Sequence, residues 1–350
     1  MKISICIPQY NRIDFLVKSL KIIELQNYNN FEVIISDDCS TDNTENTILD
    51  FKKKSRCNII YFRFDSNQGY DRNLRKSIEL ANGDYCLILG NDDTLNHVNV
   101  LSDLFTFLTT YNFPDIGFCN YCEFYNSKII TRRALKTGVI GTGPDIGLKY
   151  YSSFSFVSGL IFKKKTFDIF NTNRFDKSIY SQIALAFHMI CNNAFLFSID
   201  EVYIRKDITI FFDGIPKKSN SYLNFINRDW LSVKKVDAGL KSVINVLYKV
   251  LKDNHLISQK RLNYIFKKIL FNTYPFWIID YKYNKAFPES IGLYLGMQPT
   301  SIRHFYKLSF SLKLKYFFGY QFVSILAFLT PSKLFFRFKE DIYSWIKRKS

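Results

Sequence analysis

Several signatures of common protein classes are missing from this sequence of 350 residues. The phosphate-binding patterns GxxxxGK[ST] and GxGxxG do not occur, which argues against ATPases and dinucleotide enzymes. The start has no signal-peptide pattern, because Met1 leads straight into the strand-like segment ISICI. No run of about 20 uninterrupted apolar residues occurs, as a membrane-spanning helix would need. We therefore expect a cytoplasmic protein that does not span a membrane.

Cysteine is present but forms no recognisable framework. Seven cysteines are scattered along the chain, and only Cys119 and Cys122 have CxxC spacing. No second pair and no nearby histidine completes a zinc site. The pattern is typical of thiols in a reducing compartment.

Charge is unevenly distributed. The formal net charge is +17, with about −4 in residues 1–120 and about +21 in the remainder. The acidic part favours a site for cations or polar ligands. The basic part favours a surface that meets phosphates, nucleic acid or a membrane face. Apolar residues make up 47% of the chain, which is enough for a large core.

The first ninety residues alternate strand patterns with helix patterns. The predicted strands are Ile3–Ile7, Phe31–Ile35, Ile59–Phe64 and Asp84–Leu89. Helical spacing occurs over 13–25, over 71–82 and around Ile48 and Phe51. This alternation predicts a largely parallel sheet covered on both faces, with ligands bound beyond the carboxyl ends of the strands.

Later segments are less regular. Ser155–Phe162 is predicted as a buried strand and Ile179–Ile190 as an apolar helix. Beyond about residue 220 the chain becomes helical and basic, with helices expected over Val233–Leu251 and Leu262–Phe271.

Acids, amides and one arginine follow the four predicted strands, and these residue types suit a phosphorylated ligand. Asp92 and Asp93 could hold a divalent cation, although a solvated acidic turn has the same pattern. Asp37 or Asp38 could accept a hydrogen bond from a pyrimidine or a ribose, and this segment also resembles a helix cap. Gly69, followed by Asp71, Arg72 and Asn73, opens a helix whose start would suit phosphate.

Taken together in order, these segments resemble family 2 glycosyltransferases with the GT-A fold. The segments are ISICIPQYNR at 3–12, SDDCSTDNT at 36–44, NQGYDRN at 67–73 and ANGDYCLILGNDD at 81–93. The last two are similar to bacterial abequosyltransferase-like enzymes of O-antigen assembly. The resemblance is strong over about 1–95 and thinner to about 210, where SGLIFKKKTF at 158–167 still matches.

The resemblance implies roles for individual residues. The residues that it places at the nucleotide sugar are Pro8, Tyr10, Asp37, Asp38, Arg72, Asn73 and Asn91. Among them, Asp38 would bind the pyrimidine, and Pro8 and Tyr10 would pack on the base and ribose. Asp92 would bind Mg²⁺ or Mn²⁺, with Asp93 beside it.

Three departures from the family pattern stand out. Gly90 replaces the first acid of the metal-binding motif, and Cys39 replaces a glycine. Ser181 and Gln182 lie near the place of the Glu-Asp pair that supplies the catalytic base. Asp176 is then the nearest acid and the candidate base, with a helix cap as its alternative role. His188 is the nearest imidazole and is expected to be a core histidine.

The end of the chain is aromatic and basic. Tyr316–Leu329 is apolar apart from three residues, and a helix over 332–350 would align Leu334, Phe335, Phe338, Ile342 and Trp345 on one face. Such a helix could lie in an anionic membrane interface or pack on a core with a solvated basic face. Nucleic-acid binding is disfavoured by the acidic front and by the absence of a binding motif.

The sequence thus predicts a GT-A domain over 1–215 and a helical, basic-aromatic region over 216–350 that associates with a membrane. The expected reaction transfers a hexose or deoxyhexose from a nucleotide diphosphate sugar to a polyprenyl-diphosphate-linked oligosaccharide. This would occur at the inner face of the plasma membrane. Two alternatives remain: a sugar-nucleotidyl or phosphoryl transferase, and a non-catalytic scaffold of a polysaccharide assembly complex.

Overall fold

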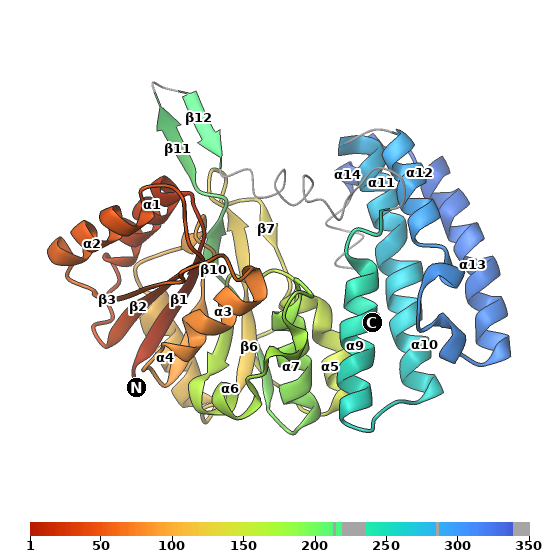
Figure 1. Cartoon of the computed structure of the whole chain (residues 1–350), viewed down its shortest axis with the longest axis horizontal. Helices are drawn as coiled ribbons and strands as arrows, with labels where there is room; N and C mark the ends of the chain where they lie inside the picture. The colour runs from red at the N-terminus through yellow and green to blue at the C-terminus, as the bar shows by residue number, and fades with distance from the viewer. Residues whose placement is uncertain (213–214, 219–235, 285–286, 339–350) are drawn as a thin grey trace. The chain divides into compact units, whose positions relative to one another are not determined.

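The chain divides into two compact units, residues 1–221 and 222–350. The structure, a computed structural model, describes residues 1–212, 215–218, 236–284 and 287–338. The first unit is α/β, and the described part of the second is helical (Figure 1).

A mixed sheet of ten strands forms the centre of the first unit. Its order is β3-β2-β1-β4-β9-β6-β10-β5, with β7 paired to β6 and β8 to β10. The strands are β1 Ile3–Gln9, β2 Phe31–Asp37, β3 Asn58–Arg63, β4 Tyr85–Ile88, β5 Thr94–Leu95, β6 Ile116–Glu123, β7 Ile130–Thr131, β8 Gly138–Gly141, β9 Leu160–Lys163 and β10 Leu196–Lys206. The four strands β3, β2, β1 and β4 are parallel, as their alternation with helices predicts. The strand β9 is antiparallel to both of its neighbours, β4 and β6.

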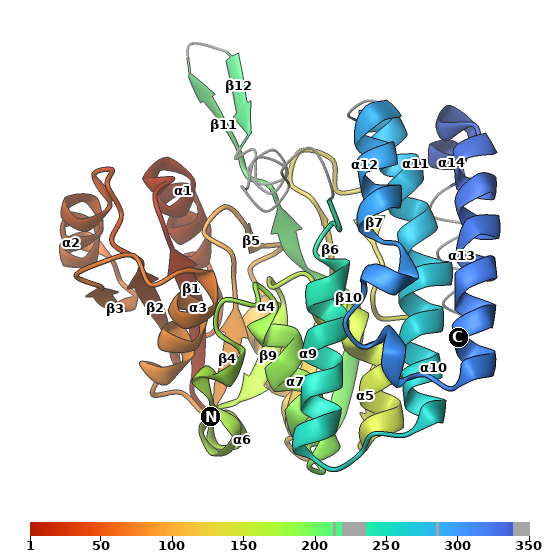
Figure 2. The same cartoon turned by 45° about the vertical axis from the view of Figure 1, so that its right-hand side comes forward.

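Helices cover both faces of this sheet (Figure 2). They are α1 Ile13–Ile23, α2 Thr44–Lys54, α3 Tyr70–Glu79, α4 Val100–Thr110, α5 Pro144–Tyr150, α6 Lys164–Phe170 and α7 Ser181–Cys191. A hairpin of β11 Thr209–Phe212 and β12 Ile215–Lys218 follows β10. Alternate residues of β1, namely Ile3, Ile5 and Ile7, form one apolar cluster with α1 and α4. The helix α3 contacts β1 and β2 without joining that cluster, so it covers the opposite face.

The prediction of a buried strand over Ser155–Phe162 is wrong in its first half. Only Leu160–Lys163 is a strand, and a 3₁₀ turn occupies Tyr151–Phe154. The Arg133 guanidinium explains the difference, because it donates to the backbone carbonyls of Ser153, Phe156 and Ser158. These carbonyls are therefore engaged by a side chain rather than by a neighbouring strand.

The second unit is a set of helices in its described residues. They are α9 Leu240–Asp253, α10 Gln259–Lys267, α11 Tyr274–Asn284, α12 Phe287–Gly296, α13 Phe310–Leu329 and α14 Ser332–Arg337. A π-helical turn over Lys268–Thr273 joins α10 to α11, and α11 packs against both α12 and α13 (Figure 2). Ile342 and Trp345, two members of the predicted apolar face, lie outside the described residues.

The apolar run Tyr316–Leu329 belongs to a longer helix. α13 begins six residues before the apolar run at Tyr316 and extends for 20 residues. Within the described ranges it is the one helix whose length and composition would allow it to cross a membrane. Length and composition are shared by core helices of water-soluble proteins, so they do not establish a span. Only 22% of the most apolar 18-residue window of α13 is buried.

The pairing of β6 with β10 depends on a glycine. Gly117 stands opposite Phe197, and a Cβ atom at Gly117 would lie 2.3 Å from the Phe197 ring. We expect Gly117→Ala to lower the free energy of unfolding by about 1–3 kcal/mol through overpacking. In the double variant Gly117→Ala/Phe197→Leu, the loss should be smaller than the sum of the two single losses. Urea unfolding of the four proteins checks this, and strictly additive losses would contradict it.

Candidate functional site

A single buried glutamine connects the loops at the carboxyl ends of the parallel strands. The Gln9 backbone carbonyl accepts hydrogen bonds from the Asp38 amide at 2.9 Å and from the Asn73 side chain at 2.9 Å. Its side-chain Oε1 accepts from Asn91 Nδ2 at 2.8 Å, and its Nε2 donates to Thr44 Oγ1 at 3.0 Å. Residues following β2, β3 and β4 are thereby held to the last residue of β1 at one edge of the sheet.

The loop after β1 is backbone-strained and tied to the loop after β2. Asn11 and Arg12 both have left-handed backbone angles, with φ of 53° and 62°. The Asn11 amide donates to Ser40 Oγ at 2.8 Å, and Asn11 Oδ1 accepts from the Thr41 amide at 2.8 Å. Tyr10 is 45% exposed between these fixed residues, so its ring is available to a ligand.

The two acids that follow β2 have different surroundings. Asp37 is fully buried and accepts from the Ser40 amide at 3.0 Å and from the Tyr61 hydroxyl at 2.7 Å. Burial, together with this hydrogen bond, raises the pKa of Tyr61. The contacts of Asp37 therefore fix the loop. Cys39 has φ of 61°, so the position where the family pattern has glycine is left-handed here.

Asp38 closes the segment that leads into α3. Its Oδ1 accepts from the Gln68 amide at 2.6 Å and its Oδ2 from the Gly69 amide at 2.9 Å. Burial and then the nearby charge of Asp37 raise the pKa of Asp38, although the two amides act against this. Asp38 is thus a rigidly held acceptor.

α3 brings one of its two predicted site residues to the rim and directs the other away. The amide oxygen Oδ1 of Asn73 is buried and has no hydrogen-bond partner within the described ranges. Arg72 instead pairs with both carboxylate oxygens of Glu79, at 2.9 and 2.8 Å, and its guanidinium lies 5.7 Å from the centre of the Phe64 ring. The structure therefore does not bring Arg72 together with the residues that Gln9 connects.

The Asn91-Asp92-Asp93 turn divides its acids between two environments. Asp92 Oδ2 forms an ion pair with Arg12 Nη1 at 2.7 Å. Asp93 points inward, where it accepts from the Ser158 hydroxyl and from the Asp207 amide at 2.9 Å. Burial and then the charge of Asp92 hold the pKa of Asp93 well above its ordinary value. Asp93 therefore anchors the turn.

Gly90 has little room for a side chain. A Cβ atom there would lie 3.0 Å from Asp93 Oδ2, 3.1 Å from Ser158 Oγ and 3.3 Å from Asp92 Oδ1. The Gly90 amide donates to Ser158 Oγ at 2.7 Å. The turn packs closely against Ser158 at Gly90, the position where the family motif has its first acid, and this leaves little space for an acidic side chain.

The donor set fits a cation bound by one carboxylate. Among the residues that the structure describes, no group of three or more His, Cys, Asp or Glu is placed to hold a metal ion. Mg²⁺ and related ions are commonly held by one or two carboxylates together with substrate phosphates. Asp92 suits that role, whereas the Asp93 oxygens are taken by protein donors.

Asp176 lies in a different polar cavity. Arg75 Nε donates to Asp176 Oδ1 at 2.9 Å and Arg75 Nη2 to Oδ2 at 2.6 Å. Glu79 and Asn171 complete this network, in a cavity of about 470 Å³ that also includes Arg72. Both oxygens of the predicted base are therefore engaged by one guanidinium.

Asp71 is a buried acid whose structural role the sequence did not reveal. Its Oδ2 accepts from the Ile179 amide at 2.7 Å and its Oδ1 from the Ser181 amide at 3.1 Å. It therefore satisfies amides at the start of α7, where Ser181 and Gln182 are buried. His188, later in α7, packs edge-on against Phe170 with ring centres 5.4 Å apart, but it is only partly buried, so the expectation of a core histidine is wrong.

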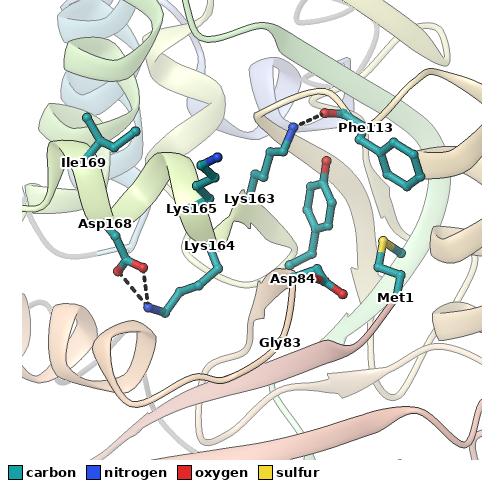
Figure 3. Close-up of a pocket in the computed structure, with 10 residues that line it drawn as sticks. Met1, Gly83, Asp84, Phe113, Lys163, Lys164, Lys165, Asp168 and Ile169 are labelled. Atoms are coloured by element: carbon teal, nitrogen blue, oxygen red, sulfur yellow. Dashed lines mark hydrogen bonds and ion pairs between the residues drawn. The ribbon is translucent and has the colours of Figure 1, made fainter.

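A cavity of about 880 Å³ lies at the opposite ends of the same strands (Figure 3). Its lining includes Gly83 and Tyr85 at the start of β4 and three successive lysines. Lys163 donates to the Phe113 carbonyl at 2.9 Å, and Lys164 pairs with Asp168 at 2.7 and 2.6 Å. None of the predicted site residues lines it, so the larger volume does not mark the site.

Sequence comparisons place these features in a known group. A family model described as "Glycosyl transferase family 2" matches residues 4–180. Abequosyltransferase RfbV of Salmonella typhimurium is 36% identical over 186 residues, which are 48% of this chain and 54% of that protein. The GalNAc(5)-diNAcBac-PP-undecaprenol beta-1,3-glucosyltransferase of Campylobacter jejuni is 30% identical over 27% of this chain and 30% of that protein. The matches span about half of the first relative and less than a third of the second.

Structural comparison extends over most of the chain. The crystal structure of S. aureus TarS 1–349 in complex with UDP has a TM-score of 0.53 and 16% identity, and the match covers 92% of this chain and 91% of that chain. The same TarS region in complex with UDP-GlcNAc has a TM-score of 0.51. At such identity the likeness shows the fold alone. It confirms the predicted GT-A α/β fold with a helical C-terminal region.

Removing the Gln9 side chain should loosen the site selectively. We expect Gln9→Ala to lower the free energy of unfolding by about 1–3 kcal/mol, because the Asn91 side chain, the Thr44 hydroxyl and the Asn11 carbonyl each lose a hydrogen bond. Hydrogen exchange should also accelerate over residues 10–12 and 90–93. Gln26 is an equally buried glutamine that bonds His97 and Leu101, so Gln26→Ala is a matched control. Equal protection of residues 90–93 in both variants would contradict the role of Gln9.

Asp71 should make stability depend on pH. Burial raises its pKa in the folded state, so the folded protein binds this proton more tightly than the unfolded chain. The extra stability is fully present below the unfolded pKa, near 3.9, and is lost as the pH rises through the raised folded pKa. In urea unfolding from about pH 4 to pH 8, the stability difference between the wild type and Asp71→Ala should therefore shrink with rising pH. Asp50→Ala, an exposed acid, serves as the control.

Proposed function

The chain belongs to glycosyltransferase family 2, and on that premise we propose that it transfers a hexose or deoxyhexose from a nucleotide diphosphate sugar to a hydroxyl of a lipid-linked oligosaccharide. Residues 1–215 would form the transferase domain and 216–350 an accessory region at the membrane. The relatives are an abequosyltransferase and a glucosyltransferase whose name gives a PP-undecaprenol-linked saccharide, which supports sugar transfer to a lipid-linked acceptor. The observation that carries the proposal is the convergence of Asp38, Asn73 and Asn91 on Gln9.

The nucleoside would bind between the loops after β1 and β2. The exposed ring of Tyr10, with Pro8, offers a surface on which a base and ribose can pack. The Asp38 carboxylate would accept from the N3–H or N4–H₂ of a pyrimidine. The amides of Gln68 and Gly69 hold its two oxygens in place, so little reorganisation accompanies binding. The TarS structures with UDP and UDP-GlcNAc support a nucleotide sugar as the donor class.

The diphosphate would bind near the Asn91-Asp92-Asp93 turn. Asp92 would hold Mg²⁺ or Mn²⁺, which neutralises the charge that develops on the leaving diphosphate. Arg12 adds a second cation at this place, because its guanidinium lies 2.7 Å from Asp92 Oδ2. Arg12 would orient the Asp92 carboxylate and could bind a phosphate oxygen directly. Asp93 would hold the turn in place through its hydrogen bonds with Ser158 and the Asp207 amide.

The acceptor hydroxyl must lose a proton as it attacks the anomeric carbon. The role of Asp176 as the catalytic base stays a prediction. The observed hydrogen bonds of Asp176 show what must change before it could act as a base. The carboxylate would have to leave Arg75, because both of its oxygens accept from that side chain. The acceptor class we propose, a polyprenyl-diphosphate-linked sugar, places the enzyme at the inner face of the plasma membrane.

Nucleotide binding tests the donor site. We expect thermal stabilisation by one of CDP, UDP, GDP and dTDP in the presence of Mn²⁺, with at least roughly tenfold weaker binding in Asp92→Asn. Asp168→Asn, at the opposite end of the sheet, should bind like the wild type. Release of that nucleotide from the cognate sugar donor would then report turnover.

The outcomes separate the parts of the proposal. Stabilisation that does not need metal would keep the donor site and remove Asp92 as a metal ligand. Folded protein that responds to none of the four nucleotides would refute the donor site and favour the scaffold alternative.

A further inference from the structure

One helix of the second unit presents its apolar side outward. On α13 the side chains of Phe318, Phe322 and Leu329 are 65%, 63% and 74% exposed, and Leu314 and Ile325 are 44% and 57% exposed. These five residues follow a spacing of three or four, so they share one face of the helix. In a water-soluble protein this face would be polar.

The opposite face of α13 directs its polar groups inward. The Tyr316 hydroxyl donates to the Asn263 carbonyl at 2.6 Å, and the Tyr320 hydroxyl donates to the Tyr294 carbonyl at 2.6 Å. Ser324 bonds the Tyr320 carbonyl at 2.7 Å and the Tyr274 hydroxyl at 2.9 Å. Hydroxyls turned in and apolar side chains turned out are the arrangement expected of a helix whose outer surroundings are apolar.

The end of α13 is satisfied without water. Lys282, on α11, donates its ammonium group to the carbonyls of Ala327, Phe328 and Thr330. The last carbonyls of a helix have no partner within the helix, and in an apolar environment each would carry a large desolvation cost. The Lys282 ammonium supplies these carbonyls with donors and so lowers that cost.

The charges around α13 have one sign. Residues 299–338 contain six Lys and Arg residues and no Asp or Glu. Arg303 and Lys307 precede the helix, Lys313 and Lys315 lie in its first two turns, and Lys333 and Arg337 follow it. Cations at both ends of an apolar face match the headgroups of an anionic bilayer.

We propose that α13 is the membrane seat of this protein, lying in the interfacial layer of an anionic lipid bilayer with its exposed face toward the acyl chains. Its inner face bonds α10, α11 and α12, so lipid cannot surround it as it surrounds a spanning helix. A second copy of the chain suits the face less well, because pairing would bring two sets of cations together with no acid to offset them.

This seat rests on the proposed function in one respect: a lipid-linked acceptor gives the enzyme a reason to be at the bilayer. Its physical basis is separate, since the residues that carry it belong to the second unit, whereas the donor-site residues belong to the first. The two proposals can therefore fail independently.

Vesicle flotation of the full chain tests the seat. The probes are vesicles of phosphatidylcholine alone and of phosphatidylcholine with phosphatidylglycerol at about 7:3. We expect binding to the anionic vesicles that weakens at high salt, and at least a roughly tenfold loss in Phe318→Ser/Phe322→Ser. Leu25→Ser/Ile169→Ser removes two residues of similar exposure, 60% and 68%, from the first unit and should bind like the wild type.

Three results would overturn the seat. The first is equal binding of wild type and Phe318→Ser/Phe322→Ser, and the second is no binding by the wild type. The third is a wild-type dimer in sedimentation without lipid that becomes monomeric in that variant, which would assign the face to a second copy. Nucleotide stabilisation measured without lipid keeps the two proposals apart. If the wild type binds vesicles but no nucleotide stabilises it, only the donor site is refuted.

Discussion

The candidate site depends on the hydrogen bonds of one buried residue, Gln9, made by its backbone carbonyl and by its side-chain amide. Parallel strands end at the same edge of a sheet, but their loops are polar and would separate if each were solvated independently. Gln9 offers both a carbonyl and an amide in a buried position, so it binds residues that follow β2, β3 and β4 at once. Because an unsatisfied buried amide is costly, these partners are held as a group rather than singly.

Around Gln9, two pairs of neighbouring acids, Asp37 with Asp38 and Asp92 with Asp93, have different roles within each pair. All four side chains are buried and bonded. Asp37 and Asp93 accept from Tyr61 and Ser158, whereas Asp38 accepts from the amides before α3 and Asp92 pairs with Arg12, at the loops where the proposed donor would bind. The contacts of Asp37 and Asp93 fix the two loops, and the loops then set the positions of the Asp38 and Asp92 carboxylates.

Hydrogen bonds between buried polar groups also organise the second unit, but there they leave an apolar surface rather than a polar site. Its polar groups face inward and are paired, which leaves an apolar outer face on α13. A protein that remained in water would gain nothing from this inversion, because exposed phenylalanines order water while buried hydroxyls need partners. An anionic lipid surface would account for both features of α13, the outward apolar face and the cations at its two ends.

The sequence alone determined the strand–helix alternation, the parallel half of the sheet and the family, because periodicity and short-range loop motifs are local properties. It also placed Asp38, Asn73 and Asn91 at one edge. Only the tertiary structure decided which acids point inward, because that depends on partners such as Ser158 and Tyr61 that are distant along the chain. The pairing of Arg75 with Asp176, 101 residues away, was also decided by the tertiary structure. So was the irregular segment before β9, whose carbonyls bond Arg133. Side-chain pairing across such separations leaves no periodic signal in a sequence, and it is this pairing that fixes a site.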